Sequence, residues 1–141
     1  MRIARARAAD AAELFALNEA FNGAGANSLE GVRAALEGES GEVALIASDG
    51  GRIVGFCCGR AMRSVCYSYG YAEITELYVI ERRRREGIGA RLLEAMESEL
   101  TALGARHFHI LTGAGNAAAK SLYSSRGYRG TDEVLLDKNI D

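Results

Sequence analysis

Hydrophobic residues recur along this chain with two periods, one near 3.6 residues and one of two residues. Leu14, Leu17 and Phe21, for example, share one face at helical spacing. Because the chain contains no proline, glycines and clusters of Asn, Asp and Ser mark the ends of its elements. The predicted elements, in chain order, are a strand Ile3–Arg7, helices Asp10–Phe21 and Leu29–Leu36, strands Val43–Ser48, Arg52–Met62 and Tyr69–Ile80, a helix Ala90–Leu103, a strand His107–Thr112, a helix Asn116–Ser125, and strands Tyr128–Arg129 and Glu133–Asp137.

Residues with known positional preferences support these boundaries. Asp10 with Glu13 three residues later is typical of a capping box at a helix start. The run Asp49-Gly50-Gly51 favours a tight hairpin, and Gly104 favours a helix end. Three consecutive strands before the helix at Ala90 imply a mixed sheet, with a parallel pair across that helix.

Composition excludes several classes of protein. The chain has 141 residues and a net charge of −2, so it suits one globular domain without a basic field for nucleic acid. No apolar run reaches the roughly 20 residues of a membrane span, and the N-terminus does not read as a signal peptide. We therefore expect a cytoplasmic protein that binds neither nucleic acid nor membrane.

The cysteines and histidines do not indicate a metal site. Cys57, Cys58 and Cys66 lack metal-ligand spacing, and the first two point to opposite faces of a predicted strand. We interpret them as small packing residues, with a catalytic thiol as the alternative. His107 and His109 share one face of a strand but have no visible third ligand, so no metal is predicted.

A glycine-containing turn carries the clearest chemical signal. The run Arg84-Arg85-Glu86-Gly87-Ile88-Gly89 joins a predicted strand to an amphipathic helix. The first N–H groups of a helix lack intrahelical partners, and the helix dipole places partial positive charge there. Since glycines let a bulky anion approach closely, this turn predicts a site for phosphate or pyrophosphate.

Two motifs lie around this turn and on the predicted helix that begins at Asn116. The first is the Leu77-Tyr78-Val79 strand end followed by Arg84 to Ala90. The second is Asn116 with Leu122-Tyr123, followed by Gly127-Tyr128. Together they resemble the GNAT superfamily of acyl-CoA-dependent N-acetyltransferases, whose main pattern is Arg/Gln-x-x-Gly-x-Gly/Ala after a Val-containing strand end. The chain departs from relatives in carrying Arg85-Glu86 where Gly-Lys is frequent, and in lacking a proline after the Val79 strand.

The resemblance implies an α/β fold built as a single GNAT domain over residues 1–141. It would contain a mixed, mostly antiparallel sheet of about six or seven strands and about four helices, with central strands splayed around the CoA site. The implied activity is direct transfer of an acetyl group from acetyl-CoA to a primary amine, without a covalent acyl-enzyme. Relatives also suggest a possible homodimer.

The same resemblance assigns roles to individual residues. Residues from Arg85 to Ala90 would hold the CoA pyrophosphate, and the backbone of Leu77–Val79 would pair with the pantetheine arm. An N–H at or beside Val79 would then polarise the thioester carbonyl. The complete predicted cofactor set is Leu77, Val79, Arg84, Arg85, Glu86, Gly87, Ile88, Gly89, Ala90 and Asn116. The run Arg82–Arg85 would add positive charge to this site, and for Arg82 and Arg83 a solvated loop is an equal alternative.

Two further groups are candidates for acid–base chemistry. Tyr123 would protonate the leaving thiolate, and it shares a helix face with Asn116 seven residues earlier. The alternative is that Asn116 only caps the helix while Tyr123 packs. Glu76 is the preferred general base and Glu73 the alternative; their odd spacing predicts opposite faces of the strand, so that only one can face the cleft.

The acceptor is not indicated by any motif. Residues Phe21–Gly31 and Ser64–Tyr71 should shape its site, and the tyrosines of the second segment could form an aromatic wall, a dimer surface or ordinary packing. A small-molecule amine, possibly aminoglycoside- or polyamine-like, is the first expectation. The alternatives are protein N-terminal acetylation, a non-catalytic CoA-binding sensor or interaction module, and another nucleotide-binding protein.

Overall fold

The computed structural model describes residues 1–140, with the side chain of residue 39 excepted. The chain divides into two compact units, Met1–Leu111 and Thr112–Asp141, which we describe separately. Among the described residues, no helix is long and apolar enough to cross a bilayer.

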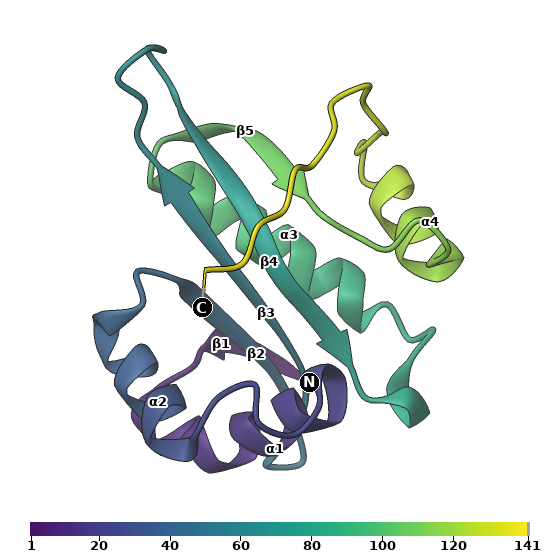
Figure 1. Ribbon diagram of the computed structural model, residues 1–141. Coiled ribbons are helices and arrows are strands. Elements are labelled where there is room, and N and C mark those ends of the chain that lie inside the picture. Colours follow the sequence, from purple (N-terminus) through teal and green to yellow (C-terminus); the bar gives the residue numbers. More distant parts are fainter. Residues whose placement is uncertain (141) are drawn as a thin grey trace. The chain divides into compact units, whose positions relative to one another are not determined.

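The first unit is built on one five-stranded sheet (Figure 1). The strands run in the spatial order β1-β2-β3-β4-β5, and only the β4–β5 pair is parallel. Their bounds are β1 (Arg2–Arg5), β2 (Val43–Asp49), β3 (Arg52–Met62), β4 (Gly70–Val79) and β5 (Ala105–Ile110). The predicted mixed sheet, with its parallel pair across a helix, is therefore confirmed.

Helices cover the two faces of this sheet. Helices α1 (Ala11–Asn22) and α2 (Leu29–Ala34) bury Ala11, Leu14 and Val32 against Ile46 and Phe56 of β2 and β3. Helix α3 (Ile88–Ala102) runs behind β3 and β4 in Figure 1. Short helical turns at Ala8–Asp10, Ala35–Glu39 and Glu81–Arg83 complete the unit.

Close packing of α3 depends on missing side chains in β3. A Cβ added at Gly55 would lie 3.2 Å from Leu92 Cδ1, and one added at Gly59 would lie 3.0 Å from Leu100 Cδ1. Leu92, Leu100 and Met96 are fully buried here. Since neighbouring strand residues face opposite sides, Phe56 lies on the α1 face and Gly55 on the α3 face.

The predicted capping box at Asp10 is wrong in its partners. The Asp10 side chain makes no cap bond to α1; its Oδ2 instead accepts from the Arg7 N–H at 2.8 Å. Glu13 accepts from the Ile53 N–H on β3 at 2.5 Å. The Glu13 carboxylate, which the local pattern assigned to the helix start, therefore accepts a hydrogen bond from a backbone N–H far along the chain.

The second unit contains helix α4 (Ala117–Ser125) and, as far as the chain is described, no strand. The predicted strands Tyr128–Arg129 and Glu133–Asp137 are therefore wrong, and the sheet has five strands instead of about six or seven. Val134 and Leu136 are 79% and 89% exposed. Alternation predicts which side a strand would bury, but a strand forms only where a neighbouring edge accepts its hydrogen bonds.

Candidate active site

The turn before α3 presents unused backbone donors. Gly87 is the N-cap of α3 with φ of +78°, and no side chain caps this end. The N–H groups of Ile88, Gly89 and Ala90 lie in the first turn, where a helix offers no acceptor. Arg85 also has positive φ, +65°, which is uncommon outside glycine. Such alternating backbone forms a concavity of N–H groups that suits an anion.

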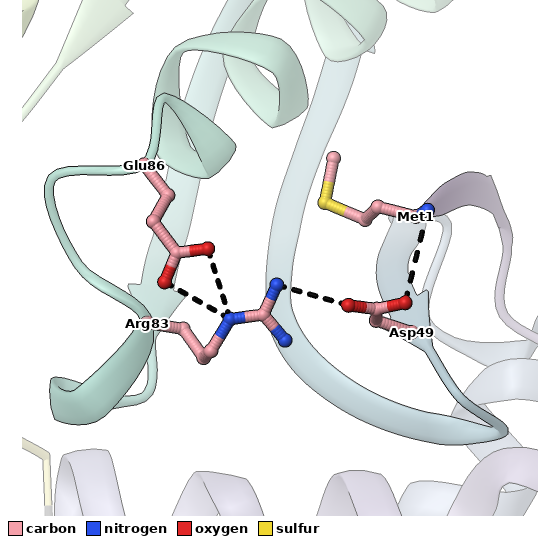
Figure 2. A network of polar contacts seen from close by, with 4 residues as sticks. All are labelled: Met1, Asp49, Arg83 and Glu86. Carbon is pink, nitrogen blue, oxygen red and sulfur yellow. Dashed lines mark hydrogen bonds and ion pairs between the residues drawn. The ribbon is translucent and has the colours of Figure 1, made fainter.

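Arg83 neutralises the acidic residue in this turn. Its Nε donates to both Glu86 carboxylate oxygens, at 3.1 and 3.0 Å, and its Nη2 donates to Asp49 Oδ2 at 3.0 Å. Figure 2 shows the Arg83 side chain lying between the two carboxylates, with Asp49 also 3.8 Å from the Met1 amino nitrogen. The hydrogen bond from Arg83 is the main reason that the pKa of Asp49 lies below its usual value. The negative charge of Glu86 is thus paired in a position beside the anion concavity.

Strand β4 has an unpaired edge beside this turn. Its pairing with β5 ends at Ile74, which is opposite Ile110, so 75–79 have no strand partner on that side among the described residues. The N–H of Ile80 donates to Val54 on β3 at 3.0 Å. Because backbone groups alternate in direction along a strand, the N–H and C=O of Val79 point to the open edge.

Arg84 occupies part of this edge. Its Nε donates to the Val79 carbonyl at 2.8 Å, and its guanidinium carbon lies 5.6 Å from the centre of the Tyr78 ring. Arg84 therefore ties the turn to the end of β4 and covers the Val79 carbonyl, and its terminal nitrogens take no part in that bond.

A β-bulge changes the faces of the two candidate bases. Glu76 lies opposite Cys58 while Ile74 lies opposite Gly59, so Thr75 is an extra residue in β4. Glu73 lies opposite Arg60. The added residue breaks the two-residue alternation, and both carboxylates therefore lie on the α1 face. The prediction that Glu73 and Glu76 face opposite sides is wrong for this reason.

The two carboxylates nevertheless differ in their surroundings. Glu73 is paired with Arg60, whose Nη2 lies 3.2 Å from Glu73 Oε2. Burial raises the pKa of the Glu76 carboxyl; a hydrogen bond from Asn22 Nδ2 at 3.4 Å acts in the opposite direction, and the charge of Glu42 adds to the rise. A carboxylate with a raised pKa and no cationic partner is better suited to accept a proton near neutral pH.

Aromatic rings border Glu76 on the same face. The ring centroids of Phe21 and Tyr78 lie 5.0 Å apart in a stacked arrangement, and Phe56 lies 5.9 Å from Tyr78. Phe21 is 41% exposed, so this wall is open to an incoming molecule. Asn22, the next residue, donates to Glu76 at 3.4 Å. A role of Phe21–Gly31 in shaping an acceptor site stays a prediction.

The catalytic-thiol alternative loses support. Burial raises the pKa of the Cys57 thiol to about 12. Burial likewise raises the pKa of Cys58, with a contribution from the charge of Glu42. A thiol is a nucleophile in its ionised form, and these surroundings disfavour that form. Among the described residues, no group of three or more His, Cys, Asp or Glu side chains could hold a metal ion.

The second unit holds the other predicted site residues on α4. Asn116 is the N-cap, and its Oδ1 accepts from the Ala119 N–H at 3.1 Å. The Tyr123 ring centroid lies 6.1 Å from that of Tyr128. The capping interpretation of Asn116 therefore holds, and its amide NH2 group is not used by the cap.

The sequence did not indicate the contributions of Asn22 and Glu42, or the pairing of Arg83 with Glu86. The spacing of three residues between Arg83 and Glu86 is the signal that could have shown this pair. Glu42 lies 33 positions before Thr75, and Asn22 lies 54 before Glu76, so no local pattern could connect them.

Comparison with known proteins points to one family. The model of the acetyltransferase (GNAT) family matches residues 11–128. An uncharacterised N-acetyltransferase, YhfO of Bacillus subtilis (strain 168), is 32% identical over 134 residues, which are 91% of this chain and 89% of that protein. The D-amino-acid N-acetyltransferase HPA3 of Saccharomyces cerevisiae is 36% identical over 66 residues, but these cover only 47% of this chain and 40% of the yeast protein.

A solved structure gives the same fold. It is an aminoglycoside acetyltransferase from an uncultured soil metagenomic sample, in complex with sisomicin. It matches with a TM-score of 0.82 and 20% identity, over 99% of this chain and 95% of that one. At this identity the match bears on the fold alone.

Proposed function

This chain belongs to the GNAT family of acetyl-CoA-dependent N-acetyltransferases, and we propose that its residues 1–141 act as one catalytic domain that acetylates a small-molecule primary amine. The proposal rests on one observation: three features occur together in the same strand–turn–helix segment. They are an uncapped helix start preceded by two positive-φ residues, an open edge of β4, and a carboxylate with a raised pKa.

The turn and the strand edge account for acetyl-CoA binding. The N–H groups of residues 85–90 hold the pyrophosphate, with positive charge added by Arg84. The backbone of Leu77 at the open edge of β4 pairs with the pantetheine amides as an added strand would. The Val79 N–H, which points to this open edge, stabilises negative charge on the thioester oxygen.

Glu76 starts the reaction by removing a proton. The acceptor arrives as an ammonium ion, and Glu76 takes one proton from it, directly or through a water molecule. The free amine attacks the thioester carbon and forms the C–N bond. The nitrogen of the tetrahedral intermediate then loses its second proton to solvent, and the C–S bond breaks as the carbonyl is restored. Tyr123 protonates the CoA thiolate, and Asn116 uses its free amide NH2 to orient the cofactor arm; these two roles rest on the family motif.

The acceptor class follows from the charge of the α1 face. Glu76 presents a carboxylate there, and the Phe21 and Tyr78 rings form a neighbouring wall. A carboxylate beside aromatic rings favours an acceptor that combines a cationic amine with an apolar portion. The solved relative bound to sisomicin is an example of this fold used on an aminoglycoside. Protein N-terminal acetylation is the second candidate.

Turnover with matched variants tests the proposal. We expect Glu76→Gln to lower kcat/KM by about 10²-fold or more, because a positioned base contributes that much. Glu73→Gln, on the same strand and face, should retain most activity because Glu73 is neutralised by Arg60. Thiol release would be followed with amines, polyamines, aminoglycosides and N-terminal peptides.

The alternatives give different results in the same assay. Tight CoA binding with no thiol release from any acceptor would indicate a CoA-binding sensor instead of an enzyme. Release with N-terminal peptides alone would overturn the small-molecule acceptor. Full activity of Glu76→Gln would show that Glu76 is not the base. Loss of activity in Glu73→Gln would assign that role to Glu73.

A further inference from the structure

Glu42 is a carboxylate that the proposed reaction does not use, yet it contacts the strand that carries the base. Thr75 Oγ1 donates a hydrogen bond to Glu42 Oε1. The backbone N–H of Glu42 donates to Ser40 Oγ at 3.1 Å, which anchors the main chain at this residue. The Glu42–Thr75 contact therefore joins an anchored residue just before β2 to the middle of β4.

Thr75 is the residue that makes the bulge. It has no counterpart in β3, since Cys58 and Gly59 are opposite Glu76 and Ile74. A bulged residue lacks its share of the ladder hydrogen bonds, so its conformation needs support from elsewhere. The Glu42–Thr75 hydrogen bond supplies it, and the bulge is what turns Glu76 toward the α1 face.

We propose that Glu42 is a positioning residue for the general base: it holds the β4 bulge through Thr75, and its charge keeps Glu76 ready to bind a proton. The inference rests on the proposed role of Glu76. Glu42 acts through Thr75 and through its own field, without contacting the reacting atoms.

The surroundings of Glu76 make Glu42 the dominant nearby charge. Arg60 and Glu73 form an ion pair with each other and largely cancel. From α1 the neighbour is Asn22, which has no charge. The charged and titratable groups on this face around Glu76, among the described residues, are Glu42 before β2, Cys58 and Arg60 on β3, and Glu73 and Tyr78 on β4.

Two variants separate the two effects of Glu42. Glu42→Gln keeps an oxygen acceptor for Thr75 but removes the charge, so the acid limb of the kcat/KM profile should move to lower pH while the plateau stays close to wild type. Thr75→Val removes the hydrogen bond but keeps the charge, so plateau kcat should fall on the order of tenfold as Glu76 loses its position. KM for acetyl-CoA should be unchanged in both.

Glu94→Gln on α3 is the matched control, since Glu94 is exposed and should leave the profile unaltered. Thermal melting shows whether each variant is folded at the assay temperature. An unmoved acid limb in Glu42→Gln, or a wild-type kcat in Thr75→Val, would overturn the proposal.

A measurement independent of activity distinguishes failure of this inference from failure of the proposed function. Carbon-detected NMR of the Glu76 carboxyl reports its titration in wild type and in Glu42→Gln. A lower midpoint in the variant supports the coupling even if Glu76→Gln proves fully active. An identical midpoint refutes the coupling even if Glu76 is the base.

Discussion

At the scale of single residues, charge pairing decides which carboxylate can act as a base. Glu73 and Glu76 share a strand and a face, but Arg60 binds the first while burial acts on the second. A group whose charged form is disfavoured holds its proton more tightly. The difference in reactivity that we propose for them therefore comes from neighbours on β3, α1 and the segment before β2.

The raised pKa of Glu76 predicts the pH dependence of turnover. The base must be ionised to accept a proton, so activity should fall as pH falls through a pKa that lies above the ordinary carboxyl value of about 4.3. Acceptors whose amines differ in pKa distinguish ionisation of Glu76 from ionisation of the substrate. The limb caused by Glu76 stays at the same pH for every acceptor, whereas a limb caused by the substrate moves with the pKa of its amine. A limb that moves entirely with the acceptor would contradict the assignment.

The Arg83–Glu86 pair gives a second prediction at this scale. Arg83→Gln leaves an unpaired negative charge beside the anion concavity, so we expect the Kd for CoA to rise roughly tenfold, about 1.4 kcal/mol. Adding Glu86→Gln should restore binding, because the repelling charge is then absent. Calorimetric titration of the single and double variants measures the cycle. A double variant as weak as Arg83→Gln would show that Arg83 contacts the cofactor itself.

At the scale of elements, the start of α3 combines three structural features in a few residues. The strand–helix connection ends there, the first-turn N–H groups have no acceptor within the helix, and the backbone is left-handed at Arg85 and Gly87. The boundary lies two residues before the predicted helix start at Ala90. That is the usual uncertainty of helix ends, and it places Ile88 and Gly89 in the helix.

Gly87→Ala tests this element. Alanine at φ +78° costs roughly 1–2 kcal/mol of backbone strain, so the turn should relax and CoA affinity should fall about tenfold. Gly104→Ala is the matched control: it follows the far end of α3 at φ +99° with an equally open Cβ position. Both variants should lower the melting temperature, and only Gly87→Ala should weaken CoA. Equal CoA affinity of the two variants would show that the turn at Gly87 does not contribute to CoA binding.

At the scale of the whole molecule, ligand binding should be visible as stability. A ligand that binds only the folded chain stabilises it by about 2.7 kcal/mol at a concentration of 100 Kd. We therefore expect CoA and acetyl-CoA to raise the melting temperature, whereas ATP and NAD should not. Hydrogen exchange should slow at the N–H groups of Ile88–Ala90. A larger shift with ATP or NAD would favour a different nucleotide-binding function. The homodimer stays a prediction that sedimentation analysis can check.

Local sequence determined the features that depend on neighbours in the chain. The helical stripe of α3, the hairpin at 49–51 and the glycine turn at 84–89 each follow from short-range geometry and were confirmed as elements. The paired motifs at Arg84–Ala90 and Asn116–Tyr123 indicated the family that the comparisons then showed. These patterns could be found because a helix start or a tight turn constrains residues only a few positions apart.

Tertiary structure decided what depends on partners far along the chain. The bulge at Thr75 exists relative to β3, and it alone brings Glu73 and Glu76 to one face. The Glu42–Thr75 contact joins the residue before β2 to the middle of β4. The two C-terminal strands failed as predictions because an alternating pattern carries no information on whether a partner edge exists. Register and long-range pairing are properties of the assembled sheet, and a sequence pattern with a period of two cannot specify them.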